Sequence, residues 1–362
     1  MFDIYHYAGG GRNWGDLALI YGMQCGLQNA ARGRPLRFIN LDLKQAIPIA
    51  DDTVKLINQG DMLLVGGGGL VMRGDGFSTD SGWQFNISLP NLADIEVPIV
   101  VYGIGYNNFP YEDPLSDQVW EHLRIVQNRA ALFSVRDQGT KQVLMQHGLK
   151  DMDVIPDPAT SLPTVDTGLF LGDCSLAVGV NWAGDRQGLR SKGTMEDDIR
   201  AFCSLLSGFL ETVEGSKAFF IPHVNYDILA YEYFKKCMPG KIENIIDIMP
   251  ELWPESFARV PLFADVYSKM DLVIGMRGHS LIIPFGQGTP IVGYGQHTKL
   301  DFFAAETGAQ VIHHAEHSQG YFNSVLQRSM SERRGNDGVR IWAEANEALV
   351  AFNRRVVGVL TG

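Results

Sequence analysis

Residues 271–299 read Asp271-Leu-Val-Ile-Gly-Met-Arg-Gly-His-Ser-Leu-Ile-Ile-Pro-Phe-Gly-Gln-Gly-Thr-Pro-Ile-Val-Gly-Tyr-Gly-Gln-His-Thr-Lys299. The apolar run Leu272–Gly275 predicts a short buried strand of a parallel sheet. Ser280–Gly286 predicts a short helix, and Ile291–Tyr294 predicts the next strand. A strand, a helix and a second strand in this order are typical of an open α/β sheet, which binds its ligands beyond the carboxyl ends of the strands.

Polar and cationic side chains gather at that edge of the predicted sheet. Arg277 and His279 follow the first strand, Ser280 begins the helix, and Lys299 lies just past the second strand. The free N–H groups of a helix N-terminus bind anions. They lower the pKa of a nearby histidine, whereas a bound anion raises it, so His279 is suited to proton transfer near neutral pH. We therefore expect an anionic substrate with His279 as a catalytic residue, and a purely structural histidine is the alternative.

The same alternation of strands and helices runs through the rest of the chain. In the first half, the predicted strands are Phe2–Tyr7, Arg37–Leu41, Asp61–Val65, Pro98–Tyr102, Ala131–Val135 and Val154–Ile155. In the second half, the further predicted strands are Leu176–Asn181, Ala218–Ile221, Ile245–Ile248 and Gln310–Ile312. The pattern predicts two Rossmann-like, doubly wound α/β domains, residues 1–168 and 169–335, with a cleft between them. Residues 336–362 predict a helix that crosses back onto the first domain, because the second domain is complete without it.

Two motifs in the first half lie at predicted strand ends. The run Gly66–Gly69 allows either close backbone packing or contact of Gly67, Gly68 and Gly69 with a ligand. It is not the G-x-G-x-x-G fingerprint of a dinucleotide enzyme. Asn13 and Asp16 lie at the first strand-to-helix turn, where they either cap the helix or accept hydrogen bonds from a sugar hydroxyl.

Two further residues are candidates for the cleft. Arg136 leaves the predicted strand Ala131–Val135, and its guanidinium is suited to a carboxylate or a phosphate. A structural salt bridge to Asp137 or Asp157 is the alternative reading. His223, which follows the strand that ends at Ile221, is a weaker candidate for substrate contact.

Composition excludes several classes of protein. The 362 residues contain 30 lysines and arginines against 41 aspartates and glutamates, a formal charge of −11. Nucleic-acid binding requires a basic surface, so we expect no nucleic-acid partner. The four cysteines form no C-x-x-C pair, so we expect no metal and no disulfide framework. We expect a cytoplasmic protein without a signal peptide or transmembrane segment, for which contact with the inner face of a membrane remains open.

Taken in order, seven motifs resemble the polysaccharide pyruvyl transferase family. They are Asn13–Asp16, Gly66–Gly69, Tyr102–Gly105, Ser134–Asp137, Asp157–Ala159, Arg277–His279 and Lys299. The resemblance covers nearly the whole chain. It implies two domains like those of GT-B glycosyltransferases, with the acceptor on the first domain and the donor on the second. Gly278 and Pro284 depart from the family's pattern, and both could reshape the acceptor pocket.

The resemblance also implies a reaction. Pyruvate passes from phosphoenolpyruvate to two hydroxyls of one sugar, in a polysaccharide or its lipid-linked precursor, and forms a cyclic ketal without a cofactor. His279, Arg136 and Lys299 would be catalytic, and Arg277, Ser280, Asn13, Asp16, Gly67–Gly69 and His223 would bind substrate. Two alternatives remain open: a GT-B-type nucleotide-sugar glycosyltransferase or epimerase, and a non-catalytic binding subunit of a polysaccharide assembly complex. The sequence leaves the acceptor sugar, the hydroxyl pair, the stereochemistry and the oligomeric state open.

Overall fold

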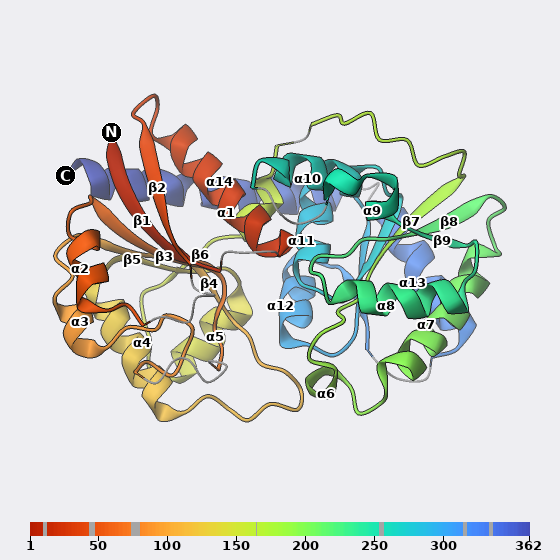
Figure 1. The fold of residues 1–362 in the computed structure, drawn as a ribbon, viewed down its shortest axis with the longest axis horizontal. Helices are drawn as coiled ribbons and strands as arrows, with labels where there is room; N and C mark the ends of the chain where they lie inside the picture. The colour runs from red at the N-terminus through yellow and green to blue at the C-terminus, as the bar shows by residue number, and fades with distance from the viewer. Residues whose placement is uncertain are drawn as a thin grey trace.

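Two parallel six-stranded sheets, one in each half of the chain, form the framework of the molecule (Figure 1). The structure is a computed structural model that describes residues 1–9, 13–42, 48–73, 80–163, 165–252, 257–313, 317–332 and 336–362. Helices flank both sheets, and the two lobes lie side by side. The predicted α/β architecture with two Rossmann-like sheets is confirmed.

The first sheet has the strand order β2-β1-β3-β4-β5-β6, and every neighbouring pair is parallel. Its strands are β1 (Phe2–Ala8), β2 (Leu36–Asp42), β3 (Met62–Val71), β4 (Ile99–Tyr106), β5 (Ala130–Val135) and β6 (Asp153–Val154). Its helices are α1 (Trp14–Ala30), α2 (Asp51–Ile57), α3 (Leu89–Ala93), α4 (Asp117–Arg129), α5 (Gln138–Gln146) and the 3₁₀ turn η2 (Pro158–Ser161).

The second sheet has the order β12-β11-β10-β7-β8-β9 and is also parallel throughout. Its strands are β7 (Leu176–Asn181), β8 (Ser216–Phe220), β9 (Ile242–Asn244), β10 (Leu272–Gly275), β11 (Ile291–Tyr294) and β12 (Gln310–Ile312). Its helices are α6 (Gln187–Arg190), α7 (Met195–Leu210), α8 (Asp227–Cys237), α9 (Ile245–Ile248), α10 (Val260–Ser268), α11 (His279–Gly286), α12 (Thr298–Thr307) and α13 (Gln319–Glu332). Two 3₁₀ turns, η3 (Pro250–Leu252) and η4 (Phe257–Arg259), precede α10.

Two sequence predictions of local structure are wrong. Ile245–Ile248 forms the helix α9 rather than a strand, because the side chain of Asn244 accepts a hydrogen bond from the backbone N of Ile246 and caps a helical turn. The edge strand β9 precedes it. The predicted strand end at Val65 is the second error, since β3 continues to Val71 and Gly66–Gly69 lie inside it. A Cβ at Gly66 would lie 2.3 Å from the carbonyl O of Tyr102 on β4, so close backbone packing explains the absence of a side chain there.

The strand orders place one switch point in each sheet. In the first sheet, β2 lies on one side of β1 and the later strands lie on the other side, so the switch point is between β1 and β3. In the second sheet, β8 and β9 lie on one side of β7 and β10 to β12 lie on the other, so the switch point is between β7 and β10. Open α/β sheets bind ligands in the crevice outside the carboxyl ends of the strands at such points. The segments after β1, β7 and β10 therefore form the predicted location of a site.

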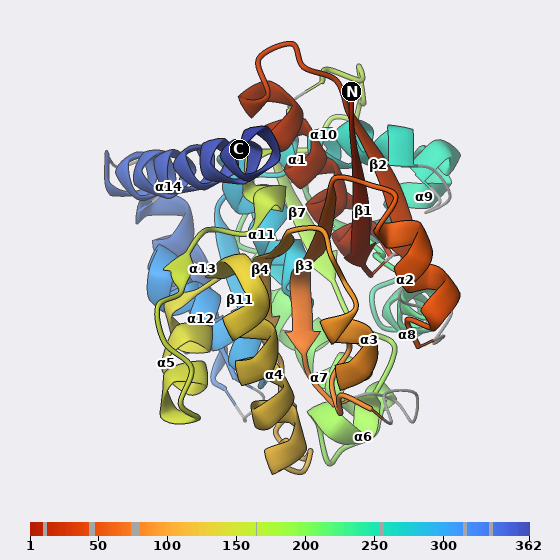
Figure 2. The same cartoon turned by 90° about the vertical axis from the view of Figure 1, so that its left-hand side faces the viewer.

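The C-terminal helix α14 (Asn336–Thr361) begins beside the second lobe and packs on the first sheet next to α1 (Figures 1 and 2). Its apolar residues Leu349, Phe352 and Val356 join a core cluster with β1, β3 and β4. The hydroxyl of Tyr102 on β4 donates a hydrogen bond of 2.6 Å to Oδ1 of Asn353. Because α14 touches the first sheet while following α13, it links the two halves of the chain.

Candidate functional site

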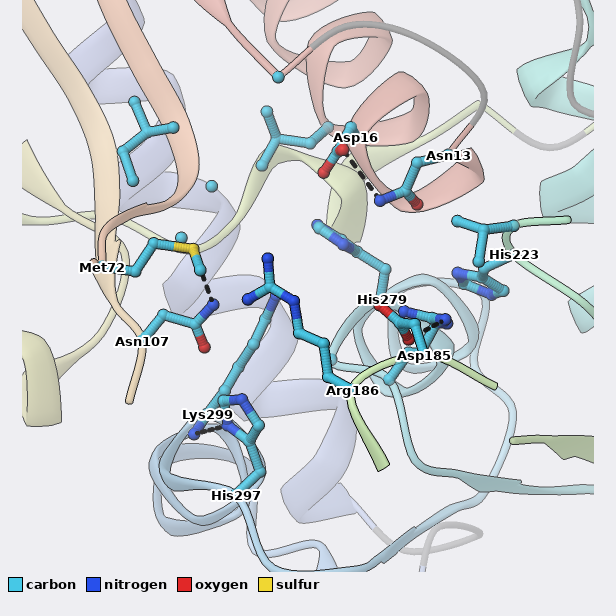
Figure 3. A pocket seen from close by; sticks show the side chains of 18 of the residues that line it. Asn13, Asp16, Met72, Asn107, Asp185, Arg186, His223, His279, His297 and Lys299 are labelled. Carbon is cyan, nitrogen blue, oxygen red and sulfur yellow. Dashed lines mark hydrogen bonds and ion pairs between the residues drawn. The ribbon is translucent and has the colours of Figure 1, made fainter. Parts of the chain in front are cut away.

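A cavity of about 650 Å³ lies between the two lobes, and we call it the front cleft. Segments after β1, β7 and β10 line it together with the glycines of β3, so both switch points contribute. Figure 3 shows Asn13 and Asp16 on one side, His297 and Lys299 on the other, and His279 and Arg186 between them. Of the residues predicted from the sequence, the lining includes Asn13, Asp16, Gly67, Gly68, Gly69, His223, Arg277, His279 and Lys299.

His279 forms a dyad with a carboxylate of the other half of the chain. It begins α11 and is only 5% exposed, and its Nε2 lies 3.2 Å from Oδ2 of Asp157. Burial alone would raise the pKa of Asp157, but His279 and Arg136 together hold that pKa below its ordinary value. Ionised Asp157 can only accept a hydrogen bond, so Nε2 of His279 carries the hydrogen in this contact. Nδ1 faces α1, where a Cβ at Gly15 would lie 2.3 Å from it, so only glycine leaves room for the ring.

Arg277 is held by two carboxylates. Its Nη2 lies 2.6 Å from Oδ1 of Asp227 and 2.6 Å from Oδ1 of Asp185. Burial would lower the pKa of Arg277, but the two carboxylates raise it above its ordinary value. Ser280 lies outside the cleft lining, since its hydroxyl donates to the carbonyl O of Arg277 at 2.6 Å. These contacts fix the turn that carries His279.

Lys299 extends across the turn after β10. A Cβ at residue 278 would lie 2.1 Å from Cε of Lys299. Because Gly278 has no side chain, it leaves room for the side chain of Lys299. Burial and the neighbouring Arg136 lower the pKa of Lys299 to about 7. The carboxylates of Asp157, Asp16 and Asp137 have the opposite effect and raise this pKa, but they do not outweigh burial and Arg136. The ammonium therefore loses its charge within the physiological pH range.

Sequence reasoning missed two arginines of the front cleft. Arg186 and Arg190 follow β7, and their guanidinium carbons lie 5.5 and 5.0 Å from the ring centroid of Phe109 in the first half of the chain. Burial and the nearby Arg277 lower the pKa of Arg190 to about 10. Arg186 has left-handed backbone angles (φ 55°), which are costly for a non-glycine residue. The run Asp185–Arg190 after a predicted strand was the signal that could have identified this pair.

The other predicted contacts have structural partners. Asn13 caps α1, since its Oδ1 accepts from the backbone N of Gly15 at 3.0 Å, and its Nδ2 donates to Asp16 at 2.9 Å. His223 is buried, and its Nε2 lies 2.6 Å from the hydroxyl of Tyr267. Burial, followed by the charge of Arg277, keeps the pKa of His223 well below its ordinary value, so this residue is neutral.

Arg136 does not line the front cleft but a second cavity of about 350 Å³ behind it, the rear cavity. Its guanidinium lies against Gly105 and is 4% exposed. Nε donates to Oδ2 of Asp137 at 3.1 Å, whereas the buried Nη1 and Nη2 have no hydrogen-bond partner among the described residues. Of the described residues, Lys299 alone lines both cavities.

The described part of the chain contains no group of three or more histidine, cysteine, aspartate or glutamate residues placed to hold a metal ion. None of the helices within the described ranges is both long and apolar enough to cross a membrane.

Comparisons with known proteins identify relatives by sequence family and by fold. A family model described as polysaccharide pyruvyl transferase matches residues 13–298, more than half of the chain. None of the curated proteins matches the chain in sequence.

The fold is similar to that of sugar-nucleotide enzymes. UDP-GlcNAc 2-epimerase from Methanocaldococcus jannaschii superposes with a TM-score of 0.59 at 10% identity, over 99% of each chain. The Neisseria meningitidis UDP-GlcNAc 2-epimerase bound to UDP-GlcNAc gives 0.56 at 9% identity, over 96% of this chain and 94% of that one. Anabaena HepE in complex with UDP-glucose gives 0.53 at 11% identity, over 99% of this chain and 98% of that one. The predicted GT-B-like, two-domain fold is confirmed, and identities this low indicate the fold alone.

Proposed function

Because the chain belongs to the polysaccharide pyruvyl transferase family, we propose that it transfers pyruvate from phosphoenolpyruvate to two hydroxyls of a saccharide and forms a cyclic ketal. One observation carries this assignment: the His279–Asp157 dyad lies at the meeting point of the two halves of the chain, where Asp157 interacts electrostatically with two basic side chains, Arg136 and Lys299. Phosphoenolpyruvate carries a carboxylate and a phosphate, and both require cationic partners. The reaction also requires a group that moves protons.

The proposed reaction conserves its atoms without a cofactor. One hydroxyl oxygen bonds to C2 of phosphoenolpyruvate while the methylene carbon accepts a proton and becomes a methyl group. The C2–O bond to phosphate then breaks, the second hydroxyl bonds to C2, and its proton leaves with inorganic phosphate. His279 takes the first hydroxyl proton and supplies one to the methylene carbon, while Asp157 orients the ring. Arg136 and Lys299 stabilise the charge on the departing phosphate.

The front cleft carries hydrogen-bond acceptors that suit a saccharide acceptor. Its lining offers the carboxylate of Asp16 and the side chain of Asn107, whose buried Oδ1 has no hydrogen-bond partner in the described part of the chain. Both groups accept hydrogen bonds from sugar hydroxyls. A polysaccharide end or a lipid-linked precursor would present such a diol at the open side of the cleft.

The function is tested by incubating the full-length chain with phosphoenolpyruvate and a panel of glycosides. We expect phosphate release that depends on the glycoside, together with a mass gain of the acceptor by one pyruvate less one water. The same panel is incubated with UDP-glucose and UDP-GlcNAc. Turnover of a nucleotide sugar without use of phosphoenolpyruvate would favour a glycosyltransferase or epimerase, and binding without any turnover would favour a non-catalytic subunit.

The affinity for phosphoenolpyruvate should fall as the pH rises through about 7. Burial lowers the pKa of Lys299 and raises that of Glu306, both to about 7. Below that pH the lysine is charged and the glutamate neutral, which favours an anion. Above it the lysine is neutral and the glutamate charged, so affinity should decrease by up to about ten-fold per pH unit for each linked proton.

Calorimetry at pH 7 in two buffers of different ionisation enthalpy measures this effect as proton uptake on binding. The Lys299→Arg variant keeps its charge over the whole range, so its affinity should depend less on pH than that of the parent. Equal pH dependence in the parent and the variant would contradict the role of Lys299.

A further inference from the structure

We propose that His297 binds the saccharide acceptor in the front cleft, donating a hydrogen bond from its Nε2 to one oxygen of the sugar. This assignment rests on the proposed function and adds a residue that selects which saccharides are accepted. It depends on the tautomer of the ring, on the side to which Nε2 opens, and on the kind of oxygen that a neutral donor prefers.

The imidazole of His297 is neutral and carries its hydrogen on Nε2. His297 is the N-cap of α12, and its Nδ1 accepts a hydrogen bond of 3.0 Å from the backbone N of Lys299. Burial, followed by the positive charges of Arg190 and Lys299, lowers the pKa of His297 to about 2. A neutral ring has one N–H group, and because Nδ1 accepts, that group is Nε2–H.

The Nε2 atom of His297 is open to a ligand. It has no hydrogen-bond partner among the described residues, and it is not one of their unpartnered atoms that are sealed from solvent. The residue is 7% exposed, and it lines the front cleft but not the rear cavity. Figure 3 shows its ring beside Lys299, across the cleft from Asp16. The small accessible part of His297 therefore offers one N–H donor to the front cleft.

Contacts with the first half of the chain hold the ring in place. It packs edge-to-face against Phe109, with the ring centroids 4.6 Å apart and the planes at 77°. The hydroxyl of the next residue, Thr298, donates to the carbonyl O of Asn108 at 3.1 Å. Because the cap, Phe109 and this bridge already fix the ring, His297 loses little freedom when a ligand binds.

A neutral donor suits a sugar oxygen better than an anion. Hydroxyl and ring oxygens accept from a neutral N–H group, whereas a carboxylate or a phosphate gains more from a charged donor. The front cleft provides charged donors in Arg186 and Arg190, so an anion there does not require His297. Asp16 lines the opposite side and accepts hydrogen bonds from hydroxyl groups. A saccharide between the two sides would donate to Asp16 and accept from His297.

Two substitutions separate the cap formed by His297 from its donor. In His297→Asn, the amide oxygen can take over the cap from Nδ1, but the shorter side chain places no donor at the position of Nε2. In His297→Gln, the amide can reach the position of Nε2, but glutamine is not a favoured N-cap. We expect His297→Asn to raise the KM for the accepted glycoside by about ten-fold or more and to keep more of the parent's melting temperature. His297→Gln should show the reverse pattern, with a lower melting temperature and a smaller rise in KM.

Thr194→Ala is the matched control for a lost cap. Thr194 caps α7, where its hydroxyl accepts from the backbone N of Asp197 at 3.1 Å, and it lines neither cavity. Its replacement should lower the melting temperature without changing the KM for the glycoside. Calorimetric affinity for phosphoenolpyruvate should stay within about two-fold of the parent in all three variants.

Monodeoxy analogues of the accepted glycoside identify the oxygen that His297 binds. Their inhibition constants are measured, so that analogues without a reacting hydroxyl can be compared. For the parent, removal of the bound oxygen should weaken binding by about as much as His297→Asn weakens binding of the intact glycoside. For His297→Asn, removal of the same oxygen should have little further effect, because the hydrogen bond is already absent.

Equal effects of every deoxy analogue on the parent and on His297→Asn would overturn the role of His297, even if the variant is less stable. Loss of phosphoenolpyruvate affinity with an unchanged KM for the glycoside would also overturn it, since His297 would then contact the donor substrate. Both outcomes leave transfer by the parent intact. Absence of any transfer by the parent chain would instead overturn the proposed function, and the assignment of His297 with it.

Discussion

Replacing His279 by glutamine should lower kcat for pyruvyl transfer by about 100-fold or more, while phosphoenolpyruvate affinity stays close to that of the parent. General acid–base catalysis contributes about 10²–10⁴ in rate, and a glutamine cannot exchange a proton near neutral pH. The glutamine amide can still donate to Asp157, so the contact between the two halves of the chain should persist. The rate effect should therefore appear without a corresponding loss of folding.

His122→Gln is the matched control for this experiment. His122 is also buried, but it lies in the core of the first half, where Nδ1 accepts from Trp83 Nε1 at 2.9 Å and Nε2 lies 2.9 Å from the carbonyl O of Ile87. Its replacement should lower the melting temperature and leave kcat nearly unchanged. If His279→Gln instead behaves like His122→Gln, with a lower melting temperature and more than about a tenth of the parent rate, the proton-transfer role is wrong.

Asp157→Asn separates positioning from chemistry in the dyad. An asparagine amide can donate to Nε2, which would place the histidine hydrogen on Nδ1 in the neutral ring. We expect kcat to fall and its pH profile to change, because the side chain that fixes the tautomer of His279 is lost. A fall in stability with an unchanged pH profile would indicate that Asp157 only holds the two halves together.

Much of the fold follows from periodicity in the sequence. Apolar runs such as Leu176–Asn181 and Leu272–Gly275 become central strands of a parallel sheet, where both faces are buried and alternation is not expected. The predicted strand stopped before the glycines of β3 because a glycine run is typical of a strand end, whereas at Gly66 the backbone of β4 lies so close that a side chain is excluded. The asparagine that caps α9 was hidden in a run of β-branched residues.

The front cleft was predictable, and the rear cavity was not. Arg277 and His279 follow a strand end, so the chain itself places them at the carboxyl edge of a sheet. The rear cavity is formed by the start of α5, by α12 and by α14, which are far apart in the sequence. Its lining depends on where α14 docks, and that position is set by tertiary packing rather than by any local pattern.

Arg136→Ala should weaken phosphoenolpyruvate binding by about 2–5 kcal/mol, as the loss of one partner of a buried charged contact does. The parent guanidinium is a buried cation whose Nη1 and Nη2 have no hydrogen-bond partner among the described residues, and an alanine removes that cation. Arg136→Lys keeps a positive charge but not the planar guanidinium, so its affinity should lie between those of the parent and the alanine variant. Calorimetric titration of the three proteins measures these differences directly.

Thermal unfolding of Arg136→Ala distinguishes a binding residue from a structural one. The substitution removes one ion pair with Asp137, but it also removes a buried cation whose two terminal nitrogens have no hydrogen-bond partner among the described residues. These two effects oppose each other, so the melting temperature should change little while affinity falls steeply. A structural arginine would give the reverse: a large drop in melting temperature with phosphoenolpyruvate affinity unchanged. That outcome would remove Arg136 from the donor site, because a ligand that bridges its free nitrogens must lose affinity when they are absent.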